Sequence, residues 1–91
     1  MNSKELLNLA KQRLAVESDY MFAKITGFSR TSVSNWQNGL SMSDEHAVKV
    51  AEICGLPVSV VIAWVHAERS KCPQAKAALQ QAADQLLSLA A

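Results

Sequence analysis

Residues that start and stop helices divide this chain into short segments, and they restrict its fold more than any other feature. Serine stands at positions 3, 18, 29 and 43, and glycine at positions 27, 39 and 55. A serine hydroxyl caps a helix N-terminus, and glycine takes the positive φ that ends many helices. Pro57 suits the first turn of a fifth helix, and Pro73 interrupts the chain before a sixth. The predicted helices cover residues 3–16, 18–27, 29–38, 43–54, 57–70 and 74–91.

Apolar residues recur at steps of three and four, which is the period of one buried helix face. The expected inward residues are Leu6, Leu7, Leu9, Ala10, Leu14 and Val16, then Tyr20, Ala23 and Ile25, then Ala47, Val48, Ala51 and Ile53 or Cys54, and last Ala75, Leu79, Ala82 or Ala83, Leu86 and Leu89 or Ala90. The valine-rich run Val58–Val65 also suits a β-strand. No partner strand is visible, however, and an isolated two-stranded sheet is marginal. The predicted fold class is therefore all-α.

Length and composition agree with a small globular domain. The chain has 91 residues, of which 49% are hydrophobic and 19% charged, so it can bury a modest core. The formal net charge is only +1. Between Tyr20 and Ser43 the only charged residues are Lys24 and Arg30, both positive. A nucleic-acid partner would therefore meet a small, local positive region, and two copies acting together would bind better than one.

The residue types that carry catalysis and metal binding are few and scattered: Cys54, Cys72, His46, His66, Ser32 and Ser34. The two cysteines are too few and too far apart for a disulfide framework or a zinc site, and the histidines have no partners at metal-ligand spacing. Neither serine has a His/Asp arrangement that would activate it. We expect no enzyme, no metal and no cofactor. The N-terminus has no signal-peptide core and the longest apolar run cannot span a bilayer, so a cytoplasmic protein without membrane contact is expected.

Residues 19–39 read DYMFAKITGFSRTSVSNWQNG, and their spacing suits two helices that cross steeply after a short turn. The small side chain of Ala23 allows a close approach of the two helices, and Gly27 supplies the turn. Val33 and Trp36 then lie three residues apart on the inner face of the second of these helices. The spacing indicates a helix-turn-helix whose outer face is polar and free of acidic residues.

This segment resembles the helix-turn-helix of the Cro/CI-type phage repressors and their XRE-like relatives. The tail V-S-N-W-Q-N-G at Val33–Gly39 is similar to the V-S-x-W-x-x-G of that family. The resemblance implies a lambda-repressor-like five-helix DNA-binding domain over residues 1–67. Residues 68–91 would then be a C-terminal helical extension with a role in dimerisation.

The opening M-N-S-K-E-L-L and the triplet Ser18–Tyr20 also look like those of small prophage-borne regulators. One position departs from the family pattern. The family commonly has glutamine where this chain has Asp19, and that glutamine helps to bind a backbone phosphate. An ionised Asp19 would repel phosphate, so this contact is expected to be weaker, or Asp19 caps the helix instead.

Carried over by position, the resemblance implies two sets of DNA contacts. Base contacts are expected from Arg30, Thr31, Ser34 and Asn35, and phosphate contacts from Lys24, Gln37, Asn38, Ser41 and Ser43. Arginine can donate two hydrogen bonds to guanine O6 and N7, and asparagine can bond adenine in the same bidentate way. Phosphate contacts position a protein on the duplex without reading its sequence.

Repressors of this type act as two-fold dimers whose recognition helices lie one DNA turn, about 34 Å, apart. The candidate dimer residues are Val61, Trp64, Val65, Leu79, Leu86 and Leu89, and Trp64 suits a core position equally well. The predicted function is a sequence-specific transcriptional regulator, a phage or prophage repressor that binds double-stranded DNA as a homodimer. The alternatives are an antitoxin-type autorepressor, and a helical protein–protein interaction module whose C-terminal helices bind another protein and which does not bind DNA.

Overall fold

The computed structural model describes residues 1–90, and this part of the chain contains six helices and no strand. The helices are α1 (Ser3–Arg13), α2 (Asp19–Thr26), α3 (Arg30–Gln37), α4 (Asp44–Cys54), α5 (Val58–Arg69) and α6 (Pro73–Ala90). The all-α prediction is confirmed, and Val58–Val65 forms part of α5. The predicted end of the last helix at Ala91 lies outside the described residues.

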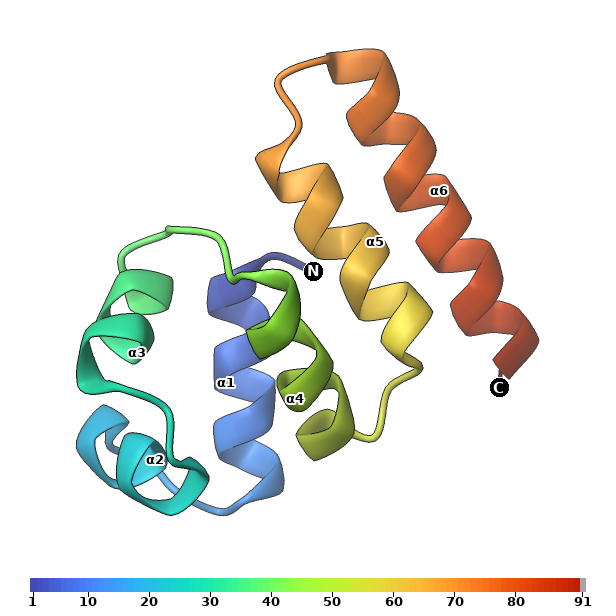
Figure 1. Ribbon diagram of the computed structural model, residues 1–91. Helices are drawn as coiled ribbons and strands as arrows, with labels where there is room; N and C mark the ends of the chain where they lie inside the picture. The colour runs from blue at the N-terminus through green and yellow to red at the C-terminus, as the bar shows by residue number, and fades with distance from the viewer. Residues whose placement is uncertain (91) are drawn as a thin grey trace.

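The six helices form a compact body with a helical hairpin at one side (Figure 1). α1 packs against α3 and α4, and α2 packs against α3. α5 lies between this group and α6, which runs antiparallel to α5 on its outer side (Figure 1). α3 is therefore at the opposite side of the molecule from α6, with one face left open.

Most of the predicted helix ends are confirmed. Ser18, Ser29 and Ser43 are N-caps whose hydroxyls accept hydrogen bonds from backbone N–H groups three residues ahead. Gly27 and Gly55 end α2 and α4 in the left-handed conformation, with φ of +83° and +69°. The first cap was placed wrongly.

The cap of α1 is Asn2, not Ser3. The Asn2 side chain accepts a hydrogen bond from the Glu5 N–H, and the Glu5 carboxylate accepts one from the Asn2 N–H. This reciprocal pair is a capping box, in which both partners satisfy a free N–H at the helix start. Ser3 is thereby released to become the first residue of α1, where it is buried.

The core is one continuous cluster that runs from α1 to α6. Its members include Leu6, Leu7, Ala10, Phe22, Ala23, Phe28, Val33, Trp36, Met42, Ala47, Val50, Ala51, Cys54, Val60, Val61, Trp64, Val65 and Ala83. Phe28 is central to its aromatic part, because its ring meets the Trp36 ring edge-on at a centroid distance of 5.3 Å. The His46 ring closes this group at 5.2 Å from Trp36.

The inward face was predicted with the wrong phase in α2 and α6, and wrongly at one position in α4. In α2 the buried residues are Phe22 and Ala23, while Tyr20 and Ile25 are both more than half exposed. The larger apolar ring of Phe22 takes the core position, and this rotates Tyr20 to the outside. In α4, Val50 is buried and Val48 only partly. In α6, Ala75, Leu86 and Leu89 are exposed, whereas Ala83 is buried and Leu87 packs against the core.

Part of the apolar surface that was predicted to form a dimer interface is buried inside the protein, where α5 packs on its neighbours. Val61, Trp64 and Val65 are buried within the chain by neighbouring helices, so that they offer no side-chain surface to a second copy. This half of the dimer prediction is corrected. Leu79 is half-buried, whereas Leu86 and Leu89 are exposed.

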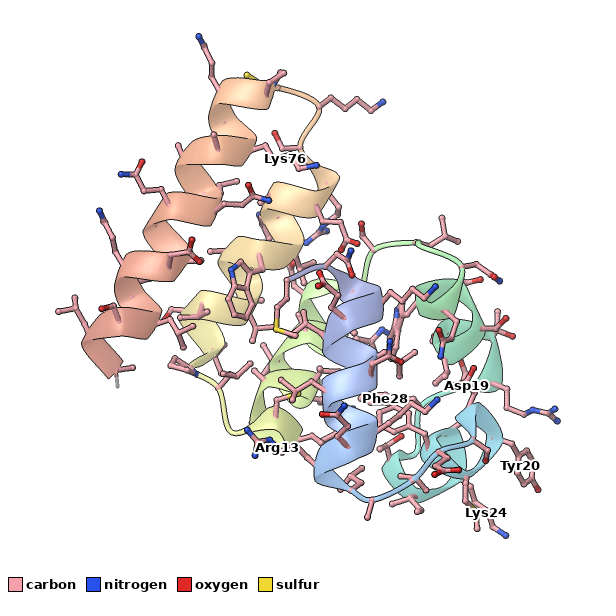
Figure 2. The ribbon with its side chains drawn as sticks, turned by 180° about the vertical axis from the view of Figure 1, so that it is seen from behind. Arg13, Asp19, Tyr20, Lys24, Phe28 and Lys76 are labelled. Carbon is pink, nitrogen blue, oxygen red and sulfur yellow. The ribbon has the colours of Figure 1, made fainter. Side chains whose placement is uncertain are left out.

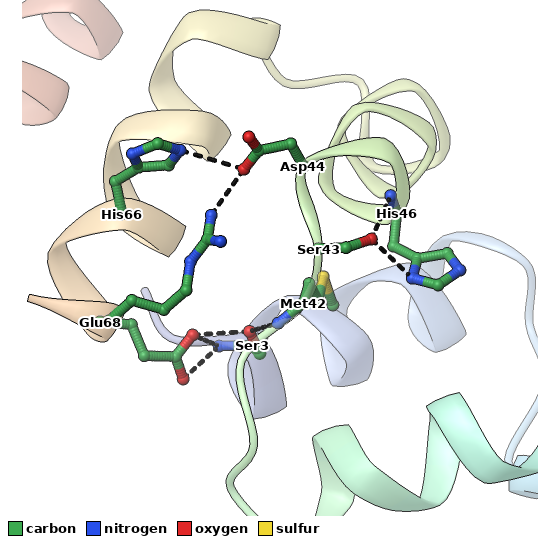
Figure 3. Close-up of polar contacts among 8 residues, drawn as sticks. Ser3, Met42, Ser43, Asp44, His46, His66 and Glu68 are labelled. Carbon is green, nitrogen blue, oxygen red and sulfur yellow. Dashed lines mark hydrogen bonds and ion pairs between the residues drawn. The ribbon is translucent and has the colours of Figure 1, made fainter.

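Ser3 joins three segments that are distant in sequence (Figure 3). Its hydroxyl donates to Glu68 Oε1 at 2.6 Å, and its backbone N–H lies 3.1 Å from Glu68 Oε2. The Met42 N–H in turn donates to Ser3 Oγ at 2.9 Å. The start of α1, the segment before α4 and the end of α5 are thereby held together.

A second polar contact lies beside the first (Figure 3). Asp44, in the first turn of α4, accepts hydrogen bonds from His66 and Arg69 of α5. The Arg69 and His66 donors hold the pKa of Asp44 below its ordinary value. Both contacts fix α5 against the rest of the protein, although the second is exposed and so contributes little free energy.

Replacing Ser3 with alanine is expected to lower the free energy of unfolding by about 1–3 kcal/mol, because the buried Met42 N–H then lacks its acceptor and Glu68 loses a donor. Urea denaturation followed by circular dichroism measures this. Ser88→Ala, at an exposed position of α6, is the control and should change stability by less than about 0.5 kcal/mol. Equal stability of the two variants would contradict a structural role for the Ser3 hydroxyl.

Candidate nucleic-acid interface

The turn between α2 and α3 is built from local hydrogen bonds and one buried ring. The Thr26 hydroxyl donates to the Phe22 carbonyl and accepts from the Phe28 N–H. Gly27 takes positive φ, which a side chain would disfavour. Phe28 then turns into the core, and Ser29 caps α3 by accepting from the Ser32 N–H. Sequence reasoning missed Phe28, although an aromatic residue directly after a turn glycine was a visible signal.

α3 has two chemically distinct faces. Val33 and Trp36 are almost completely buried, and they anchor the helix to the core. The four residues assigned to base contacts, Arg30, Thr31, Ser34 and Asn35, are all exposed. Steps of three and four place these residues on adjoining positions of one helix surface. The structure therefore brings the whole predicted base-contact set together on an open face.

Arg30 carries the only charge on that face, and it has no acidic partner among residues 1–90: the ion pairs found there involve Lys11, His66 and Arg69. Its guanidinium carbon lies 5.1 Å from the centroid of the Tyr20 ring. Asp19, Tyr20, Arg30 and Ser34 line a shallow hollow of about 230 Å³. Tyr20, which was predicted to face the core, is thus a neighbour of the candidate site.

Asp19 is paired with Lys11 of α1 and hydrogen-bonded to Gln37 of α3. Its Oδ1 atom accepts from Lys11 Nζ at 2.8 Å and from Gln37 Nε2 at 3.1 Å. Partial burial raises the pKa of Asp19, but the hydrogen bonds from Lys11 and Gln37 outweigh this, so that the pKa lies below its ordinary value. The Asp19 carboxylate, whose negative charge was expected to disfavour phosphate binding, therefore lies against Lys11.

The residues assigned to phosphate contacts occupy varied surroundings. Lys24 is exposed on α2 and projects outward, as Tyr20 does (Figure 2). Asn38 is the exposed C-cap of α3, and Ser41 is half-buried. The Gln37 amide donates to Asp19, and the Ser43 hydroxyl contacts the His46 N–H and Nδ1. Lys24 and Asn38 are therefore the two with the freest side chains.

Asp19→Asn is expected to make the protein less sensitive to acid. A carboxyl group whose pKa is depressed in the folded state stabilises the fold above its ordinary pKa of about 4. That stabilisation is lost as the pH falls through the folded pKa. Urea midpoints measured from pH 6 down to pH 3 should fall less steeply in Asp19→Asn than in the wild type. Parallel curves would show that Asp19 is not preferentially charged in the folded protein.

The fold and its exposed surface define an all-helical protein with a polar, acid-free helix face at one side. The chain matches no protein-family model, no curated protein sequence and no solved structure. Within residues 1–90 no group of three or more His, Cys, Asp or Glu side chains is placed to hold a metal ion. None of the helices there has the length and apolar character needed to cross a bilayer.

Proposed function

We propose that the protein is a sequence-specific DNA-binding transcriptional regulator, a phage or prophage repressor of the Cro/CI (XRE-like) type. In this proposal residues 1–67 form a lambda-repressor-like domain and residues 68–91 its helical extension. α3 enters the major groove and reads bases with Arg30, Thr31, Ser34 and Asn35. The observation that carries the proposal is the exposed, acid-free face of α3, whose one charge has no carboxylate partner in the described chain.

The charges around α3 support this assignment. Lys11 offsets Asp19, and Lys24 lines a hollow together with Tyr20 and Arg30. The surface near α3 is therefore positive although the whole chain carries only +1. Positive side chains beside a recognition helix bind phosphates and release counterions, which supplies affinity independent of sequence. A helix that is anchored by Val33 and Trp36 presents its outer side chains rigidly, which favours base readout.

Selection of bound duplexes from a random DNA pool tests the proposal. The wild type should enrich a short palindromic site, and Arg30→Ala and Asn35→Ala should each lose that enrichment. Lys71→Ala removes one positive charge from the segment between α5 and α6, away from α3 (Figure 1), and serves as the matched control. No enriched sequence at low salt would overturn the proposal.

A homodimer through α6 is part of the proposal. Leu86 is 41% exposed and Leu89 is 84% exposed, while Leu79 is half-buried two turns earlier on the same helix. Leu86 and Leu89 lie three residues apart on α6, so their side chains adjoin, and contiguous exposed apolar surface marks contacts with other proteins. Two-fold pairing would also give one molecule two copies of α3, which offsets the modest charge of each copy.

The double change Leu86→Glu with Leu89→Glu is expected to shift the protein from dimer to monomer, because each carboxylate would be buried without a partner in the interface. Sedimentation equilibrium measures the mass. Gln74→Glu together with Gln81→Glu adds the same charge at exposed polar positions of α6 that adjoin neither leucine and should leave the dimer intact. A dimer that survives the leucine changes would exclude this surface.

The exposed leucines also favour a second candidate, a helical interaction module that binds another protein and not DNA. An autorepressing antitoxin would combine both activities, with α3 on DNA and α6 on its toxin. Salt dependence separates the candidates, since DNA binding weakens steeply as salt rises and leucine-mediated protein binding does not.

A further inference from the structure

Tyr20 is an exposed aromatic residue with a specific neighbour. It lies at the second position of α2 and is 56% exposed, and Figure 2 shows it projecting outward. The Arg30 guanidinium carbon is over its ring, 5.1 Å from the centroid. This distance is within the range in which a cation is attracted by the face of an aromatic ring. α2 therefore contacts the first residue of α3 through an exposed side chain as well as through the core.

Arg30 lies on Tyr20 although a carboxylate is close. Asp19 lines the same hollow as Tyr20 and Arg30. Its Oδ1 atom already accepts from Lys11 and Gln37, so the Asp19 charge is offset without Arg30. An ion pair with Asp19 would occupy the guanidinium N–H groups, whereas stacking on a ring uses only the flat face. The five N–H donors of Arg30 consequently stay available at the edge of the group.

Bidentate recognition of guanine needs that edge in a defined orientation. Arginine has several rotatable bonds, and their freedom is lost when the side chain binds. A ring that holds the guanidinium before binding removes part of this cost. We propose that Tyr20 is a positioning residue for base readout, which orients Arg30 so that its N–H edge faces a guanine in the major groove. This inference rests on the proposed function, and it names the residue that confers guanine preference through Arg30.

The stack itself is measurable in the free protein. Protons on the Arg30 side chain above the ring should resonate upfield in NMR spectra. Tyr20→Phe should retain the upfield shift, and Tyr20→Leu should abolish it. Since Tyr20 is exposed, both variants should keep the fold, and the unchanged dispersion of the remaining resonances is the control. An Arg30 spectrum that is the same in all three proteins would overturn the proposal.

The second readout is base preference. Affinities are measured for two duplexes: the selected operator, and the same operator in which 7-deazaguanine replaces the guanine whose selection requires Arg30. 7-Deazaguanine lacks the N7 acceptor. Tyr20→Ala should reduce the ratio of the two affinities by about two- to fivefold, the size of an exposed cation–π contact. Tyr20→Phe should restore the wild-type ratio. The double variant Tyr20→Ala with Arg30→Ala should have the same ratio as Arg30→Ala alone, because the guanidinium that Tyr20 positions is already absent.

Three results would count against the inference. An equal loss of affinity for both duplexes in Tyr20→Ala and Tyr20→Phe would make the Tyr20 hydroxyl a phosphate contact. A further drop of the ratio in the double variant would show that Tyr20 acts without Arg30. Both leave the proposed function intact. A wild type that enriches no sequence overturns the proposed function first, and the positioning role with it.

Discussion

Replacing Arg30 and Asn35 together with alanine is expected to weaken binding to the selected operator by about 2–6 kcal/mol, or at least thirtyfold. Each bidentate contact between a side chain and a base supplies roughly 1–3 kcal/mol of discrimination. Both residues are exposed on α3, so their removal leaves no cavity and no unpaired buried group. The loss should therefore appear in DNA binding and not in the urea midpoint.

Fluorescence anisotropy with the operator and with a scrambled duplex, over a range of salt concentrations, makes this measurement. Binding to the scrambled duplex should fall far less, because only one of nine positively charged Lys and Arg residues is lost. Lys71→Ala loses the same charge and should keep the preference for the operator. If the double variant retained that preference, base readout would have to come from another surface.

Trp36→Ala is expected to cost about 3–5 kcal/mol of folding free energy, the largest effect of any single change considered for this protein. The indole is 2% exposed and contacts the rings of Phe28 and His46 edge-on. A domain of this size has a total stability of roughly 5–15 kcal/mol, so the variant would be close to unfolding at 37 °C. The melting temperature should fall by more than about 12 °C.

Thermal denaturation followed by circular dichroism tests this expectation. Trp36→Phe keeps an aromatic ring in the site and should recover part of the loss. Because Trp36 anchors α3, operator binding by Trp36→Ala should disappear as the protein unfolds and recover when it is cooled. A loss of stability below about 1 kcal/mol would show that Trp36 does not hold α3 in place.

Local signals predicted much of the fold and most of the α3 surface. A cap needs one hydroxyl and one N–H group three residues away, so Ser18, Ser29 and Ser43 could be recognised from sequence. The inner position of Val33 and Trp36 followed from helical period, and this left the residues between them outside. The prediction worked for most features that depend on neighbours within one helix turn, and the Asn2–Glu5 capping box is the exception.

Features that depend on distant residues escaped sequence reasoning. The buried Ser3 hydroxyl pairs with Glu68, 65 residues away, and no local pattern marks either residue. Tyr20 was assigned to the core by its apolar character. Its actual place is decided by Phe22, which fills the core from two residues further along α2, and by Arg30 from another helix. The same limit applied to Val61 and Val65, whose burial depends on how α5 packs.

α6 has a one-sided attachment, and this bears on how the molecule opens. It packs mainly on α5, and Ala83 is its one fully buried residue within the described part of the helix. The polar links of Ser3 and Asp44, by contrast, join α5 to α1 and α4. Segments with few buried contacts exchange their amide hydrogens through local opening, independent of global unfolding. α6 is therefore the outer layer of the protein, and we expect its amide hydrogens to exchange faster than those of α1 and α4, while the body that carries α3 stays folded.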